Sequence, residues 1–270
     1  MPVEHYENFP VASILLPRRL RRPVELIYAF ARQADDFADE GDLPAAARLE
    51  LLEGFRQELR RIEDGAAPQT PLFRDLAEIV AAHVLPLQLF HDLLDAFTQD
   101  VTRKRYADFA EVMAYCGKSA NPVGSLLLHL FREASPQNLA YSDAVCSSLQ
   151  LINFWQDVAV DYRMGRIYLP QDDMARYGVD GQQIGRADNS GGWQALMLFQ
   201  IGRTRELLQS GAPLGRLLPG RMGLEIRMIV AGGDAILRKL QACRGDVFHH
   251  RPVLQPADWP RMLYRALFTI

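Results

Sequence analysis

The sequence has few cysteines and few lysines, and each shortage excludes a class of site. The three cysteines, Cys116, Cys146 and Cys243, stand far apart and form no CxxC pair. This spacing argues against a zinc site and a disulfide framework, and it favours reduced thiols. Only three of the 30 basic residues are lysines, so most positive charges are guanidinium groups, which suit carboxylate and phosphate partners. A net charge of −3 gives no support for nucleic-acid binding.

Long apolar runs and nucleotide-binding glycine patterns are also missing. No stretch of about 18 uninterrupted apolar residues is present, as a membrane-spanning helix would require. The polar start MPVEHYENFP does not resemble a secretory signal. We therefore expect a cytoplasmic protein, with any membrane contact peripheral and at the inner membrane face. No GxGxxG motif follows a predicted strand, so no NADPH-binding fold is expected.

Apolar residues instead recur at a helical period along the chain. Pro23 suits the first turn of a helix at about 23–40, Pro86 kinks or splits the next long segment, and Ser142 is a plausible N-cap. The predicted helical segments are 23–40, 45–65, 72–100, 106–131 with a break at Asn121-Pro122, 142–165, a short helix within 166–178, 191–211, 222–245 and 256–270. No segment alternates at period 2, and no linker divides the 270 residues. The sequence predicts one all-α domain, residues 1–270.

The helix predicted at 23–40 carries an acidic stripe beside its apolar face. Tyr28, Arg32, Asp35 and Asp39 recur at i, i+4, i+7 and i+11, so they share one side of the helix. Two solvated carboxylates four residues apart repel by only ~0.2–0.5 kcal/mol. The negative end of the helix dipole disfavours them further. For this helix alone, a solvated face and a functional site explain the pattern about equally well.

The helix predicted at 143–163 carries a second polar stripe. Gln150, Asn153, Asp157 and Asp161 recur at i, i+3, i+7 and i+11. The other faces are apolar, with Leu149, Leu151, Ile152, Phe154, Trp155, Val158 and Val160. Carboxylates on a mostly buried helix require a neutralising partner. A solvated face is therefore the weaker interpretation here.

Two such stripes can face each other across a central cavity of an all-α bundle. Oxygen ligands without His or Cys nearby suit Mg²⁺ better than zinc, and Mg²⁺ usually binds a few carboxylates together with a substrate phosphate. The candidate ligands are Asp35, Asp39, Asn153, Asp157 and Asp161. We predict a site for Mg²⁺ and a prenyl diphosphate, where aromatic walls would stabilise a carbocation. Aromatic residues at helical spacing more often belong to the hydrophobic core than to a cavity wall. The candidate wall residues are Phe37, Tyr115, Phe154, Trp155 and Phe199.

Two motifs carry a resemblance to a known family. YAFARQADDFADE, and NFWQDVAVD followed by GRIYLP, resemble the aspartate motifs of the squalene/phytoene synthases, which are all-α head-to-head isoprenoid synthases. ENFPVAS, QLINFWQDVAVDYRMGRIYLP, and GGDAIL followed by RPVL are most similar to the bacterial hydroxysqualene synthase branch of hopanoid operons. The resemblance implies Mg²⁺-dependent ionisation of presqualene diphosphate, loss of diphosphate, and water capture to give hydroxysqualene without NADPH. Separate enzymes would make the substrate and reduce the product to squalene.

The resemblance also implies roles for individual residues. Asp35, Asp39, Asp157 and Asp161 match the metal-binding motifs. Further matching positions, with Arg32 expected on the diphosphate, are Tyr28, Arg32, Gln150, Asn153, Arg166 and Tyr168. Weaker candidates for substrate contact, each with a simpler structural interpretation, are His5, Asn121 at a helix break, and Arg251.

Two departures from the family pattern bear on the reaction. Many members have Arg before the first aspartate of the second motif, where this chain has Gln156, and carotenoid-type members have a Ser-rich stretch where this chain has Glu7-Asn8-Phe9. Both fit an enzyme that starts from one preformed diphosphate. The alternative is head-to-head condensation of two prenyl diphosphates, as in presqualene diphosphate, squalene or phytoene synthases. A non-catalytic assembly member is remote, because both aspartate pairs are intact. Lipophilic substrate and product also favour a peripheral membrane encounter through an exposed apolar helix.

Overall fold

The computed structural model describes residues 17–39, 41–249 and 251–269, and this part of the chain contains helices and no β-strand. The helices are α1 (Arg18–Asp39), α2 (Ala45–Glu63), α3 (Pro71–His83), α4 (Leu87–Thr102), α5 (Phe109–Ser119), α6 (Asn121–Phe131), α7 (Pro136–Arg163), α8 (Gln171–Arg176), α9 (Gly181–Gly185), α10 (Trp193–Gly211), α11 (Leu214–Leu217), α12 (Gly220–Ala242), the 3₁₀ helix η1 (Pro256–Asp258) and α13 (Trp259–Phe268). The all-α prediction is confirmed.

Two helix starts lie earlier than predicted. Helix α1 begins at Arg18, so Pro23 lies inside the helix, because the apolar face of Val24 and Ile27 already starts at the buried Leu20. Helix α7 begins at Pro136, with the Ser135 hydroxyl accepting a hydrogen bond from the Asn138 N–H. Ser followed by Pro is a favoured helix start. The prediction that Ser142 caps this helix was therefore wrong, because the N-cap is Ser135.

The two predicted breaks are confirmed. Val84 ends α3 with a left-handed φ of 53°, and Pro86 precedes the start of α4. The segment around Asn121 is helical on both sides, with the break at Ala120. The three cysteines are free, as expected.

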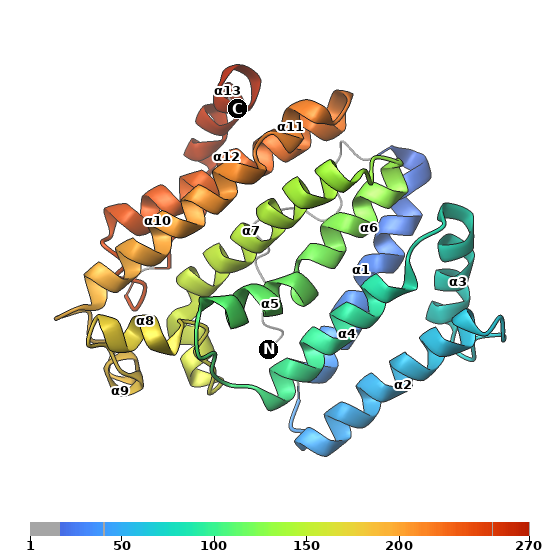
Figure 1. Ribbon diagram of the computed structural model, residues 1–270, viewed down its shortest axis with the longest axis horizontal. Coiled ribbons are helices and arrows are strands. Elements are labelled where there is room, and N and C mark those ends of the chain that lie inside the picture. Colours follow the sequence, from blue (N-terminus) through green and yellow to red (C-terminus); the bar gives the residue numbers. More distant parts are fainter. Residues whose placement is uncertain (1–16, 40, 250, 270) are drawn as a thin grey trace.

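The helices form successive layers around α7 (Figure 1). Helices α1 to α4 and α6 share one buried apolar cluster. A second cluster joins α5, α7, α10 and α12, and α6 packs against both α4 and α7. Helix α7 is accordingly buried on several sides, through Leu151, Ile152, Phe154, Trp155 and Val158. This placement brings the aspartates of α7 into the interior of the molecule.

Candidate active site

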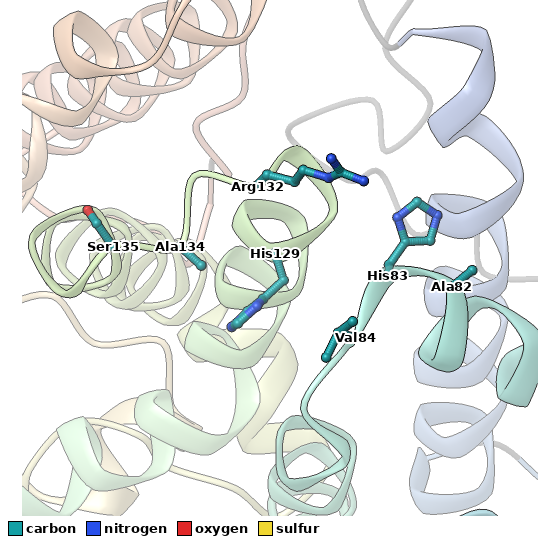
Figure 2. Close-up of a pocket in the computed structure, with 7 residues that line it drawn as sticks. All are labelled: Ala82, His83, Val84, His129, Arg132, Ala134 and Ser135. Carbon is teal, nitrogen blue, oxygen red and sulfur yellow. The ribbon is translucent and has the colours of Figure 1, made fainter.

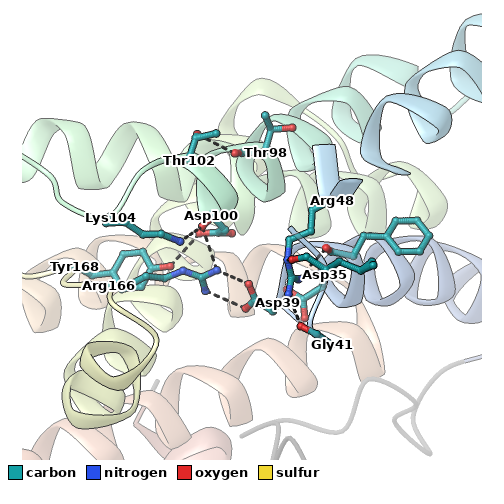
Figure 3. Close-up of polar contacts among 12 residues, drawn as sticks. Asp35, Asp39, Gly41, Arg48, Thr98, Asp100, Thr102, Lys104, Arg166 and Tyr168 are labelled. Atoms are coloured by element: carbon teal, nitrogen blue, oxygen red, sulfur yellow. Dashed lines mark hydrogen bonds and ion pairs between the residues drawn. The ribbon is translucent and has the colours of Figure 1, made fainter. Parts of the chain in front are cut away.

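The C-terminal end of α1 is fastened to α2 by one arginine. The guanidinium of Arg48 donates to the backbone carbonyls of Phe37 (3.1 Å), Gly41 (2.6 Å) and Leu43 (3.0 Å). A cation that binds the last carbonyls of a helix satisfies orphan acceptors and complements the dipole. The end of α1 that carries Asp35 and Asp39 is thereby held in place (Figure 3).

Asp39 is bound by Arg166, which follows α7 in the chain. Nη1 of Arg166 lies 2.9 Å from Oδ2 of Asp39, and Nη2 binds the other carboxylate oxygen. The Arg166 side chain is 8% exposed and that of Asp39 is 23% exposed. This bidentate ion pair joins the acidic stripe of α1 to the segment that follows α7 (Figure 3).

Asp100, at the end of α4, is a residue of this site that sequence reasoning missed. Its carboxylate accepts hydrogen bonds from the hydroxyls of Tyr115 (2.9 and 2.8 Å) and Tyr168 (3.0 Å). Its backbone carbonyl accepts from Nη2 of Arg166 (3.2 Å) and Nζ of Lys104 (2.8 Å). Burial raises the pKa of Asp100 to about 6, although Arg166 and the tyrosine hydroxyls act to lower it.

A signal for Asp100 was present in the sequence. It continues the apolar face that Leu93 and Phe97 form on α4, and it is 5% exposed. A lone carboxylate on an apolar helical face requires partners in the interior. The sequence did not show which residues those partners were.

On α7, the two aspartates of the second stripe differ in their partners. Asp157 is bound by Arg251, with Nε 2.5 Å and Nη2 2.9 Å from its two oxygens. Within residues 17–39, 41–249 and 251–269, Asp161 has no ion pair. The charges of four nearby residues nevertheless influence the pKa of Asp161: Asp157, Arg166, Asp100 and Asp39. The two predicted stripes therefore meet in one electrostatic environment.

Negative charge is in excess at two of these carboxyl groups. Burial, reinforced by Asp157, raises the pKa of Asp161 to about 8. Burial, reinforced by Asp39 and Asp100, raises the pKa of Asp35 to about 7, against the lowering effect of Arg32. The Asp35 side chain keeps 37% of its surface exposed, so solvent partly screens its charge. Perturbed carboxyl groups clustered in this way are typical of functional sites.

Aromatic rings lie next to the acidic cluster, by which we mean Asp35, Asp39, Asp100, Asp157 and Asp161, because two tyrosine hydroxyls donate to Asp100. Tyr168 stacks on Phe154 with ring centroids 3.8 Å apart, and it also contacts Tyr106 and Tyr115 at 5.6 Å. Two of the predicted wall residues, Tyr115 and Phe154, thus lie at the site. Trp155 does not, because it is fully buried and its indole N–H donates to Thr204 in the core.

The remaining predicted residues have varied positions. Arg32 pairs with Asp36 (2.8 Å) and approaches Asp35 (3.6 Å). Asn121 accepts a hydrogen bond from Ser147, one turn before Gln150 on α7. Tyr28 is 39% exposed, and Gln150 and Asn153 are half-buried. His5 and the ENFPVAS segment, for which the sequence predicted a role, lie outside the described residues.

A cavity of about 600 Å³ lies at the other end of α7 (Figure 2). Its lining includes His83, His129, Arg132 and the N-cap Ser135. The 22 residues of α7 from this cap to Asp157 correspond to ~33 Å of helix. Its position at the far end of α7 separates this cavity from the acidic cluster.

The acidic cluster fits Mg²⁺ in its chemistry. Its donors are carboxylate oxygens, the ligands that Mg²⁺ prefers. Asp161 is a half-buried carboxylate that faces other carboxylates without an ion pair among the described residues, and a divalent cation would offset that charge. In the described part of the chain, however, no three His, Cys, Asp or Glu side chains stand together in an arrangement that could hold a metal ion. Arginines hold Asp39 and Asp157 instead.

Comparisons with known proteins identify relatives of this chain. A sequence model of the family "Squalene/phytoene synthase" matches residues 3–258. The hydroxysqualene synthase of Rhodopseudomonas palustris is 36% identical over 255 residues, which cover 94% of this chain and 85% of that protein. The hydroxysqualene synthase of Zymomonas mobilis is also 36% identical, over 83% of this chain and 75% of that protein. The phytoene synthase of Mycobacterium tuberculosis is 31% identical, over 78% and 69%.

Solved structures show the same fold. The squalene synthase HpnC from Alicyclobacillus acidocaldarius superposes with a TM-score of 0.82 at 33% identity, covering 89% of this chain and 90% of that one. A dehydrosqualene synthase in complex with ligand gives a TM-score of 0.79 at 24% identity, covering 94% and 88%. The second likeness concerns the fold alone.

Proposed function

This chain belongs to the squalene/phytoene synthase family of isoprenoid synthases, and from that premise we propose that it is a hydroxysqualene synthase. It would convert presqualene diphosphate into hydroxysqualene and diphosphate, and thus act as a lyase on a carbon–oxygen bond. The names of the relatives at 36% identity support this reaction. Because phytoene synthases are also among the relatives, head-to-head condensation of two prenyl diphosphates is the second candidate function.

One observation carries the proposal. The acidic stripes of α1 and α7 converge on a single cluster that also contains Arg166, Arg251 and an aromatic wall. Carboxylates that bind metal, guanidinium groups that bind phosphate, and aromatic faces that stabilise a cation are the parts required to ionise a prenyl diphosphate. Arg166 and Arg251, which Asp39 and Asp157 hold in place before the substrate binds, would bind the diphosphate oxygens.

The reaction places different demands on the two sides of the site. The carbon–oxygen bond breaks, diphosphate leaves with the electron pair, the carbocation rearranges, and water adds with loss of a proton. Mg²⁺ bound by Asp35, Asp39, Asn153, Asp157 and Asp161 would supply neutralising charge for the departing diphosphate. The stacked rings of Phe154 and Tyr168 would face the developing cation, which the π-electrons of aromatic rings stabilise.

Product analysis by gas chromatography–mass spectrometry tests this proposal. Purified protein with Mg²⁺ and without NADPH is incubated with presqualene diphosphate, and separately with farnesyl diphosphate. Hydroxysqualene from the first substrate alone is the expected result. Consumption of farnesyl diphosphate would assign the condensing reaction instead. Inactivity on both substrates, with the fold intact by circular dichroism, would favour a non-catalytic member of the family.

Gln156 offers a prediction about substrate specificity. Its side chain is 1% exposed, and Nε2 donates to the carbonyl of Pro252, which lies next to Arg251. We expect Gln156→Arg to place a second cation beside Asp157, where it competes with Arg251. Hydroxysqualene formation should fall about tenfold, and the product ratio, which is that of hydroxysqualene to other products, should change. Gln156→Met is the control, because it removes the hydrogen bond without adding charge. It should cost about 1 kcal/mol of stability and leave the product ratio unchanged. An unaltered ratio in the Arg variant would contradict the link between Gln156 and substrate number.

A further inference from the structure

Helix α13 presents a broad apolar face to solvent. Trp259, Leu263, Tyr264, Leu267 and Phe268 are between 45% and 70% exposed. Met262 and Ala266, on the opposite side, are buried against the rest of the chain. At 100° per residue, the five exposed apolar side chains cover about half of the helix circumference. Single exposed apolar residues need no explanation, but a contiguous face rich in aromatic residues marks an interaction surface.

Basic residues border this apolar face. Asp234 on α12 is approached by three arginines: Arg265 of α13, Arg238 (2.9 Å) and Arg205 (3.5 Å). Asp258, just before α13, pairs with Lys239 (2.6 Å). Burial acts to raise the pKa of Asp258, but Lys239, the Gln255 N–H and, least, the nearby charge of Arg261 together hold it low.

These two groups, which we together call the basic cluster, contain five cationic side chains and two carboxylates: Arg205, Arg238, Lys239, Arg261 and Arg265, with Asp234 and Asp258. The chain as a whole carries a net charge of −3. The apolar face of α13 therefore lies beside an excess of positive charge in an acidic protein.

The charge excess decides between possible occupants of this face. A second copy of the chain, paired by a two-fold axis, would bring the same surface of both molecules together. Two basic clusters would then lie close to each other and repel. An anionic bilayer instead offers negative headgroups to the arginines and acyl chains to the aromatic and leucine side chains. Aromatic residues are also favoured at the boundary between headgroups and acyl chains.

We propose that α13 and the basic cluster form a peripheral docking surface for an anionic lipid bilayer, with the apolar face of α13 inserted at the level of the headgroups. No helix in the described part of the chain is long and apolar enough to span a membrane. Attachment therefore uses a helix that lies along the surface. If the proposed function is correct, this surface also brings the enzyme to its lipophilic substrate and product.

Vesicle flotation tests the docking surface without any catalytic readout, so its failure is distinguishable from failure of the proposed function. The full chain is floated with vesicles of phosphatidylcholine alone and of equal parts phosphatidylcholine and phosphatidylglycerol. Binding to the anionic vesicles is expected to exceed binding to the neutral vesicles at least tenfold. Arg261→Glu should weaken anionic binding about thirtyfold, from about fivefold per unit of charge. Leu267→Ser combined with Phe268→Ser should weaken it at least tenfold.

The matched control is Leu43→Ser combined with Leu51→Ser, which removes two exposed leucines from the region of α2. It should bind vesicles like the parent protein. Sedimentation of all proteins without lipid shows whether any of them associates. The proposal is overturned if the protein floats with neither kind of vesicle, or equally well with both. It is also overturned if the control variant loses as much binding as the α13 variant, or if the protein self-associates and the α13 variant abolishes that association.

Discussion

Asp161→Asn is expected to lower kcat for diphosphate release by at least a hundredfold, while the metal-free protein stays folded and becomes no less stable. The loss of rate follows from removing a carboxylate proposed to bind Mg²⁺. The unchanged stability follows from its surroundings, because Asp161 has no ion pair among the described residues and is repelled by Asp157. A structural residue would lose stability together with activity, so the two measurements separate the roles.

The same variant should change how stability depends on pH. The pKa of Asp161 is raised from 3.8 to about 8 in the folded protein, chiefly by burial. A carboxyl group whose folded pKa is raised contributes stability that is fully present below the unfolded value of 3.8 and is lost as the pH rises through the folded value. Thermal unfolding in chelator should show the parent less stable at pH 8.5 than at pH 6, with a smaller difference in Asp161→Asn. Part of the slope should remain, because the pKa of Asp35 is raised to about 7.

Asp143→Asn is the control on the same helix. Asp143 is half-buried, and burial raises its pKa, but it lies 18 residues before Asp161 on α7. We expect near-parental kcat from Asp143→Asn. A rate loss equal to that of Asp161→Asn, or a large loss of stability in Asp161→Asn, would contradict the proposed role of Asp161.

Arg166→Met is expected to lower the free energy of unfolding by about 3 kcal/mol and to abolish most of the activity. The substitution leaves Asp39 unpaired, and breaking a buried ion pair costs about 3–5 kcal/mol. The partial exposure of Asp39 places the cost at the lower end. Arg166→Lys should recover only part of the loss, because one ammonium group cannot bind both oxygens of Asp39. Urea unfolding and steady-state kinetics measure the two effects.

Arg163→Met provides the comparison for Arg166. Arg163 is exposed in the last turn of α7, and a surface change of this kind should alter stability by less than about 0.5 kcal/mol. A double-mutant cycle of Arg166→Met with Asp39→Asn isolates the interaction between the pair. Additive costs in that cycle would show that Arg166 does not stabilise the fold through Asp39.

The sequence predicted the helices and the two acidic stripes because both depend on local spacing. Asp35 and Asp39 share a face of α1, and Asp157 and Asp161 share a face of α7, for reasons of helical geometry alone. The family resemblance added Arg166 and Tyr168, which lie just after α7. Pro86 likewise revealed the end of one helix and the start of the next.

The contacts between the stripes could not be predicted, because they depend on how distant helices pack. Asp100 reaches Tyr168 across 68 residues, and Arg251 reaches Asp157 across 94. No period or spacing in the chain encodes such a pair. The prediction that Ser142 caps α7 was wrong for a related reason. Neighbouring helices bury Ser142, which is 4% exposed, so the helix extends past it toward its N-terminus.

The pairing of Arg166 with Asp39 and of Arg251 with Asp157 has a consequence for turnover. A diphosphate that binds these arginines must displace carboxylates attached to the same chain, and such tethered competitors act at effective concentrations in the millimolar range. After the reaction, the same carboxylates compete with the released diphosphate for the guanidinium groups. The two aspartates thus oppose retention of diphosphate by the arginines. In the metal-free protein, replacing both aspartates by asparagine should therefore tighten the binding of inorganic diphosphate.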